Sequence, residues 1–298
     1  MSFLWTLSGI RTSLLDTIFQ LITFLAQELV IIAVICALYW CIDKKLAVQI
    51  GFNYLCAGLL VQSLKITFRI PRPWVLDSEF KAVESAIPAA TGYSFPSGHT
   101  QSGTSLFATL AINAEKWYWK CIFVLTFLLI GFSRMYLGCH TPKDVITAMV
   151  ISLFFAWFTR KYLERFTSNS KWTGIITLII ILAAALVCIQ SAYLYRNQTI
   201  EYRYVTDCFK ASGAALGFAA GWYLENKTLR FSPKANNPSR NVLLLRYVVG
   251  LALTVVLKLV LKILLESTLI GEMIQYGIII FWVIFVYPWI FSRKMKYL

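Results

Sequence analysis

The chain has only two histidines, His99 and His140, and both stand in short polar motifs at the ends of apolar stretches. Asp144 follows His140 by four positions, a spacing at which a carboxylate in the first turn of a helix can meet the imidazole. A carboxylate on one ring nitrogen fixes the tautomer and makes the other nitrogen a better nucleophile or base. A lone histidine is usually just a satisfied polar group, but here both occupy such motifs. The two histidines are therefore candidates for chemistry.

Three cations accompany the histidines. Lys65 and Arg72 are seven positions apart, about two helical turns, so we expect both on one face of a helix that Pro71 and Pro73 then end. Arg134 ends a later apolar stretch. Cations fixed at helix ends suit an anion, although each one alone could also be a residue that snorkels to the membrane interface.

A helix start is predicted within YSFPSGHT, residues 93–100. Ser97 can cap this helix, and Gly98 lets the backbone approach a ligand closely. The free N–H groups of the first turn and the positive end of the helix dipole form an anion site. Together with the cations and histidines, this is equipment for phosphoryl transfer. The sequence has no clustered carboxylates and no HxH or HExxH pattern, so we expect neither a metal ion nor a cofactor.

The elements that must position these residues are predicted to be membrane-spanning helices. Of the 298 residues, 58% are hydrophobic and 14% are charged, whereas soluble domains are about a quarter charged. Several apolar runs reach the ~20 residues that a helix needs to cross the hydrocarbon core, where backbone groups must be satisfied within the segment. We predict an all-α, polytopic transmembrane helix bundle of about nine spans. They lie near residues 17–41, 46–68, 98–114, 118–137, 143–162, 174–195, 208–225, 242–266 and 269–291.

Charge placement predicts the orientation in the membrane. Most lysines and arginines fall in loops on one side of the predicted spans, and the positive-inside rule makes that side cytoplasmic, together with the C-terminus. The net charge of +14 then reflects topology, and we expect no nucleic-acid partner. The histidine motifs fall on the opposite side. The sequence thus predicts a multi-pass plasma-membrane protein whose site faces away from the cytoplasm.

The motifs in combination resemble those of a known family. They are K-x6-R-P (Lys65, Arg72, Pro73), P-S-G-H (Pro96 to His99) and S-R-x5-H-x3-D (Ser133, Arg134, His140, Asp144). In this order they resemble the three motifs of the type 2 phosphatidic acid phosphatase superfamily, which includes lipid phosphate phosphatases, glucose-6-phosphatase and the vanadium haloperoxidases. The resemblance covers roughly residues 28–165. It predicts a phosphatase core in residues 1–165, with residues 166–298 as additional transmembrane helices packed on it.

The resemblance also implies a role for each matched residue. His140 would be the nucleophile that forms a phosphohistidine, Asp144 would orient it, and His99 would protonate the leaving oxygen. Water would then hydrolyse the intermediate without a metal ion. The phosphoryl oxygens would be bound by the remaining matched residues, namely Lys65, Arg72, Ser97, Gly98 and Arg134.

The substrate and the phosphate acceptor are left open by the motifs. A pocket at the mouth of a helix bundle favours a lipid whose phosphate lies at headgroup level, such as a phosphatidate-like lipid, a polyprenyl phosphate or diphosphate, or a sphingoid-base phosphate. A soluble sugar phosphate is an alternative, since the predicted span count is similar to that of glucose-6-phosphatase. A lipid phosphotransferase would use the same motifs. A lipid transporter or scramblase fits the spans but does not explain the histidines. The oligomeric state is not predicted.

Overall fold

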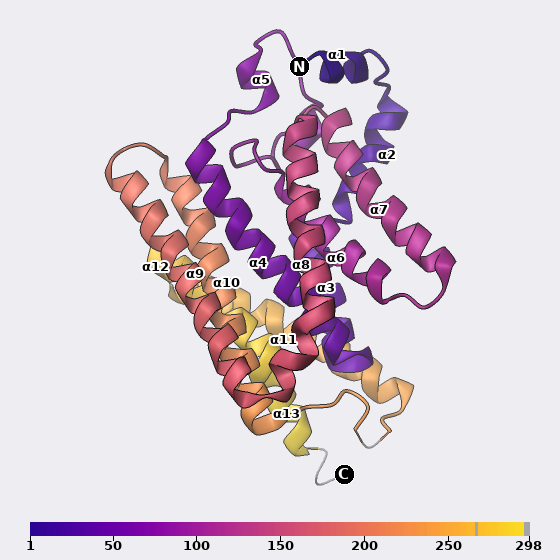
Figure 1. Ribbon diagram of the computed structural model, residues 1–298, viewed down its shortest axis with the longest axis vertical. Helices are drawn as coiled ribbons and strands as arrows, with labels where there is room; N and C mark the ends of the chain where they lie inside the picture. The colour runs from indigo at the N-terminus through magenta and orange to yellow at the C-terminus, as the bar shows by residue number, and fades with distance from the viewer. Residues whose placement is uncertain (236, 266–267, 295–298) are drawn as a thin grey trace. The chain divides into compact units, whose positions relative to one another are not determined.

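Every regular element that the computed structural model describes, over residues 1–235, 237–265 and 268–294, is a helix (Figure 1). The prediction of an all-α membrane protein is confirmed. The α-helices are α1 (Ser2–Ser8), α2 (Ser13–Phe24), α3 (Glu28–Ala37), α4 (Lys44–Phe68), α5 (Pro73–Leu76), α6 (Gly98–Asn113), α7 (Trp117–Tyr136), α8 (Pro142–Ser168), α9 (Ser170–Arg196), α10 (Tyr202–Leu224), α11 (Arg240–Leu264), α12 (Leu269–Phe281) and α13 (Tyr287–Lys294). Four short turns of π- or 3₁₀-helix complete the set: η1 (Leu38–Ile42), η2 (Glu84–Ala86), η3 (Glu225–Leu229) and η4 (Trp282–Val286).

Six of these helices are long and apolar enough to cross a membrane, and a seventh span is formed if the bent pair of α2 and α3–η1 is one span. The expected count of about nine is not confirmed. The two remaining predicted spans correspond to α6 and α10, which are not among the six. At 16 residues, α6 is only ~24 Å long, shorter than the hydrocarbon core. The other helix, α10, is rich in glycine and alanine and begins with charged residues, which lowers its hydropathy.

The chain forms two compact units. The first comprises Met1–Ile32 and Phe52–Arg160, and the second comprises Ala33–Gly51 and Lys161–Leu298. Helices α3, α4 and α8 each contribute residues to both units. The domain boundary expected at residue 165 stays a prediction.

In the first unit, α7 packs against both α6 and α2 (Figure 1). A buried polar cluster lies between α4, α6 and α8 of the same unit. In it the amide of Asn53 donates to Thr109 and Ser105, and the hydroxyls of Ser105 and Ser152 approach each other to 3.3 Å. The Ser152 hydroxyl also donates to the carbonyl of Gln101. Hydrogen bonds between helices in lipid favour their association. This cluster therefore holds α4, α6 and α8 together.

In the second unit, α10 packs closely on α12 and on α9. Two glycines of α10 permit a close approach of the α12 backbone. A Cβ on Gly213 would overlap the backbone carbonyl of Met273, and one on Gly217 would overlap that of Gly277. Only glycine allows two helix backbones to come this near. The small residues of α10 therefore serve helix packing.

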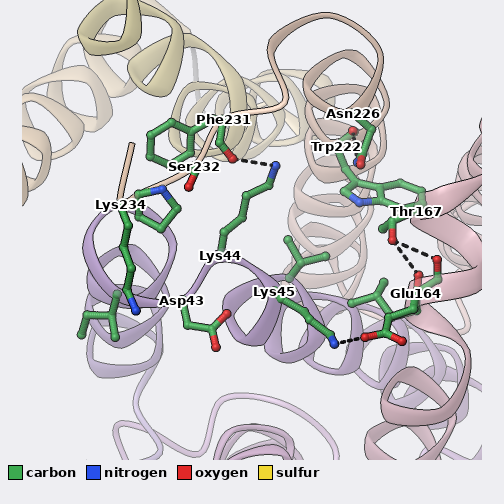
Figure 2. Close-up of a pocket in the computed structure, with 14 residues that line it drawn as sticks. Asp43, Lys44, Lys45, Glu164, Thr167, Trp222, Asn226, Phe231, Ser232 and Lys234 are labelled. Atoms are coloured by element: carbon green, nitrogen blue, oxygen red, sulfur yellow. Dashed lines mark hydrogen bonds and ion pairs between the residues drawn. The ribbon is translucent and has the colours of Figure 1, made fainter. Parts of the chain in front are cut away.

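The second unit also contains a pocket of about 560 Å³, lined by residues from α4, α8, α10 and the 231–234 segment (Figure 2). Figure 2 shows Lys44 donating to the carbonyl of Phe231, and Lys45 paired with Glu164. Lys44 also pairs with the buried carboxylate of Glu225 at 2.5 Å. Each of these two lysines thus has a carboxylate partner, and none of the predicted site residues lines this pocket.

Candidate phosphate site

The predicted site residues all lie in the first unit, at the ends of α4, α6, α7 and α8. Six of them are buried, and Gly98 and His99 are half-exposed. The site therefore opens at the start of α6. The buried residues are Lys65, Arg72, Ser97, Arg134, His140 and Asp144.

Lys65 and Arg72 reach the site by a route that the sequence did not predict. Helix α4 ends at Phe68, and Arg69 takes a left-handed conformation with φ 49°. Arg72 therefore lies outside α4, immediately before Pro73 begins α5, so the expected shared helix face is wrong. The physical reason is that Pro71 and Pro73 disfavour helical backbone at the residues before them.

The 92–94 segment nevertheless gathers both cations. The Nζ of Lys65 donates to the carbonyl of Tyr93 at 2.7 Å, and the Nε of Arg72 donates to the carbonyl of Gly92 at 2.7 Å. Backbone carbonyls carry partial negative charge, so they offer these cations the kind of acceptor that a phosphoryl oxygen also offers. The cations are thus held in place without a carboxylate at these contacts.

The tautomer of His140 follows from its contact with Arg72. Nη1 of Arg72 lies 2.8 Å from Nε2 of His140 and also donates to the carbonyl of Cys139 at 3.0 Å. A guanidinium has donors only, so Nε2 must be the acceptor and the ring proton must be on Nδ1. The lone pair of Nε2 is therefore the candidate nucleophile, and Arg72 covers it in this structure.

Asp144 lies on the Nδ1 side of the His140 ring, as its spacing predicted. Oδ2 of Asp144 is 3.7 Å from Nδ1, which is longer than a hydrogen bond. The same oxygen accepts from the backbone N–H of Thr141 at 2.8 Å and from the hydroxyl of Ser94 at 2.6 Å. Within the described part of the chain, Nδ1 of His140 makes no hydrogen bond. The carboxylate faces the imidazole, about 0.5 Å beyond hydrogen-bond reach.

Arg134 is fully buried and incompletely satisfied. Its Nη1 donates to the hydroxyl of Thr23 at 3.2 Å. Its Nε and Nη2 have no hydrogen-bond partner among the residues that the structure describes. The backbone carbonyl of Arg134 accepts from the N–H groups of Cys139 and His140, which turns the chain so that His140 follows directly. Buried donors without a partner are rare, so these two indicate a site for an anion.

Ser97 caps α6, as predicted. Its hydroxyl accepts from the N–H of Thr100, and its own N–H donates to the backbone carbonyl of Asp144 at 3.1 Å. A Cβ placed on Gly98 would meet no atom within 4 Å. Open space therefore lies next to the first N–H groups of α6, where an anion is favoured.

His140 is electrostatically suited to a nucleophilic role. Burial lowers its pKa well below the usual 6.5, and the nearby cations Arg72, Arg134 and Lys65 lower it further. The ring is therefore neutral at pH 7, with its Nε2 lone pair intact. A neutral imidazole among cations, beside an open helix N-terminus, can attack an anionic phosphoryl group that those cations hold.

Some residues of the site were missed at the sequence level. Ser94 and Thr23, which hold Asp144 and Arg134, lie 50 and 111 positions from their partners. Arg11 donates to the carbonyls of Tyr136 and Lys81, and so ties the N-terminal segment to the end of α7. Ser94 lies inside the quoted stretch YSFPSGHT, so its place was visible, but its partner was not. The other two carry no local signal.

Comparisons with known proteins identify the family of this chain. A model of the PAP2 superfamily matches residues 46–168, and a model of the PAP2 superfamily phosphatase, transmembrane extension, matches residues 209–296. The undecaprenyl-diphosphatase BcrC of Bacillus subtilis is 31% identical over 151 residues, covering 48% of this chain and 72% of that protein. The chain belongs to the PAP2 superfamily. PAP2 denotes the type 2 phosphatidic acid phosphatases, so the family resemblance of the motifs is confirmed. The PAP2 match contains all the predicted site residues.

Two further PAP2-like relatives differ in the lipid that their names specify. A lipid A 4'-phosphatase of Porphyromonas gingivalis is 31% identical over 180 residues, covering 57% of this chain and 74% of that protein. An undecaprenyl-diphosphatase of Sulfolobus acidocaldarius is 26% identical over 116 residues, covering 39% of this chain. The match spans only about half of the Sulfolobus protein, 54% of its length.

Proposed function

We propose that this protein is a metal-independent phosphatase that hydrolyses the phosphate monoester or diphosphate of a membrane lipid through a phosphohistidine. The observation that carries the proposal is the buried guanidinium of Arg134, whose Nε and Nη2 lack partners among the described residues. A buried charge of this kind is costly unless an anion completes it. The neutral, nucleophilic His140 stands at the end of the backbone turn in which its own N–H donates to the carbonyl of Arg134.

The reaction follows from the roles of the side chains. The phosphoryl oxygens bind Arg134, Lys65, Arg72 and the N–H groups at the start of α6, and this draws Arg72 from Nε2 of His140. Nε2 attacks phosphorus, and the P–O bond to the lipid breaks. His99, which takes up a proton when the phosphate anion binds beside it, gives that proton to the leaving oxygen. Water then attacks the phosphohistidine and loses a proton to His99, the N–P bond breaks, and inorganic phosphate leaves.

A lipid substrate is supported by the relatives. Three of them are named for action on undecaprenyl diphosphate or lipid A, both of which carry phosphate on an apolar anchor. The protein is an integral, multi-pass membrane protein, and its PAP2 transmembrane extension supports this. A phosphate at headgroup level reaches a site at helix ends without leaving the membrane. We assign catalysis to residues 1–165 and treat residues 166–298 as additional transmembrane helices.

The orientation belongs to the same proposal. The basic loops place the C-terminus in the cytoplasm by the positive-inside rule, so the site opens on the extracytoplasmic face, in the plasma membrane. Reaction of an impermeant thiol or amine reagent with single cysteines placed in the 77–92 and 231–235 segments of intact cells would check this. Labelling only of the second segment would contradict it.

Phosphate release by purified protein with excess chelator tests the reaction. The panel contains a phosphatidate, a polyprenyl diphosphate, a sphingoid-base phosphate and glucose 6-phosphate. We expect release from a lipid, abolished by His140→Ala. His99→Ala should slow a lipid monoester far more than an aryl phosphate, because an aryl oxide leaves without a proton.

Other outcomes contradict the proposal in distinguishable ways. Release only from glucose 6-phosphate would make the protein a sugar phosphatase. Product that appears only when a lipid alcohol acceptor is added would make it a phosphotransferase. Release that needs a metal ion, or that survives His140→Ala, would overturn histidine catalysis. Lipid transport without phosphate release would favour a transporter.

A further inference from the structure

Ser94 is a buried polar residue to which the reaction just described gives no role. Its side chain is fully buried, and its hydroxyl donates to Oδ2 of Asp144 at 2.6 Å. A hydrogen bond to an ionised carboxylate is shorter and stronger than one between neutral groups. The backbone of Ser94 is fixed as well, since its N–H donates to the carbonyl of Ile70 at 2.8 Å. Ser94 is therefore a rigid donor aimed at Asp144.

Three groups converge on the same carboxylate oxygen. They are the Ser94 hydroxyl, the backbone N–H of Thr141 at 2.8 Å and Nδ1 of His140 at 3.7 Å. Thr141 and His140 belong to the turn that carries Asp144 itself, so they move with it. Ser94 comes from a separate segment of the chain. Of the three groups, only the Ser94 hydroxyl ties the carboxylate to the segment that leads into α6.

The 3.7 Å separation between Nδ1 of His140 and Oδ2 of Asp144 affects the reaction once His140 attacks phosphorus. Attack by Nε2 places positive charge on the ring and makes Nδ1–H a stronger donor. The carboxylate can stabilise this charge only if Oδ2 stays on the Nδ1 side of the ring. Without Ser94, one backbone N–H would hold that oxygen, and the carboxylate could rotate about its terminal torsion, which has a broad energy well.

We propose that Ser94 is a positioning residue for phosphoryl transfer, which holds the Asp144 carboxylate ready to receive Nδ1–H of His140 as the phosphohistidine forms. The inference rests on the proposed function. Ser94 does not contact phosphate in this arrangement, because its hydroxyl is committed to Asp144. Its removal should therefore slow the chemical step and leave substrate binding nearly unchanged.

The test is steady-state hydrolysis of farnesyl diphosphate, a short polyprenyl diphosphate, by the full-length protein in detergent. Ser94→Ala should lower kcat about 10- to 100-fold, the loss expected for one hydrogen bond to a charged group, with KM changed less than about twofold. Ser94→Thr keeps the hydroxyl and should restore most of kcat. Ser152→Ala removes another fully buried serine hydroxyl of the same unit and should leave kcat unchanged.

A double-mutant cycle separates positioning from a general structural effect. In an Asp144→Asn background, Ser94→Ala should lower kcat by less than about twofold, because both changes act on one contact. The inference would be overturned if the two losses in kcat multiplied in the double variant. It would also be overturned if Ser94→Ala left kcat unchanged or raised KM alone. His140→Ala runs alongside: if that variant keeps full activity, the proposed function itself fails, whatever Ser94 does. Should Ser94→Ala not fold, Ser94→Cys carries the same cycle with a weaker donor.

Discussion

Replacement of Arg134 by methionine should stabilise the empty protein and disable it at the same time. Methionine keeps most of the side-chain length and removes the charge. The wild-type guanidinium has two buried donors without partners among the described residues, and each such donor costs about 1–3 kcal/mol. The change forfeits one hydrogen bond to Thr23, worth about 1 kcal/mol. The free energy of unfolding without ligand should therefore rise by about 1–5 kcal/mol.

Activity should change in the opposite direction. Two donors to a phosphoryl group contribute about 1.5–3 kcal/mol each, which corresponds to a loss of about 10²- to 10⁴-fold in kcat/KM. The assay is thermal unfolding in detergent with and without inorganic phosphate, together with lipid phosphate hydrolysis. Phosphate should raise the Tm of the wild type by mass action but should barely affect the variant.

A matched control is Arg11→Met in the same unit. Arg11 donates to the carbonyls of Tyr136 at 3.0 Å and Lys81 at 2.6 Å, so its loss should lower the Tm. The reasoning would be refuted if the Arg134 variant unfolded at a lower temperature than the wild type without phosphate. It would equally fail if that variant kept the full stabilisation by phosphate.

Two further predictions concern glycines and the ring of His140. Gly138 has φ 78°, and a Cβ there would lie 2.7 Å from Nη2 of Arg11 and 3.1 Å from Cα of Ala82. Gly138→Ala should therefore lower the free energy of unfolding by at least about 1–2 kcal/mol, measured as a lower Tm. Gly98→Ala, with open space around it, should keep the Tm and raise KM, and an equal loss of Tm in both variants would contradict this. Burial and nearby cations lower the pKa of His140, so ¹⁵N-histidine NMR of the phosphate-free protein should show a neutral ring, protonated on Nδ1, below pH 6.5. Added phosphate should raise that pKa. Titration of the ring at or above pH 6.5 without phosphate would contradict the prediction.

The sequence predicted those parts of the site that depend on local chemistry. Ser97 as a helix cap depends on nearby residues, and it was found where its type indicated. Asp144 faces His140 because four positions at a helix start bring the two together. Even so, the 3.7 Å separation was not predictable, since Ser94 draws the carboxylate from 50 positions away.

Other predictions did not hold, because contacts between distant segments compete with local preferences. Arg72 was expected to continue the face of Lys65, but the prolines end the helix earlier, and the carbonyls of the 92–94 segment then collect both cations. The span count was not confirmed for a related reason. A helix that is surrounded by other helices, as the buried residues of α6 and α10 show, does not need an apolar surface on every side. Hydropathy therefore reports lipid exposure better than it reports the number of helices.

The glycine contacts between α10 and α12 have a consequence for biogenesis. These helices are not consecutive, because α11 lies between them in the chain. During synthesis α10 emerges before α12, so Gly213 and Gly217 stay uncovered until α11 and then α12 have been inserted. A chain that stops after Leu264 would leave this seam open to any other helix with small residues. Quality-control proteases of the membrane could use such an open seam to distinguish an unfinished molecule from a finished one.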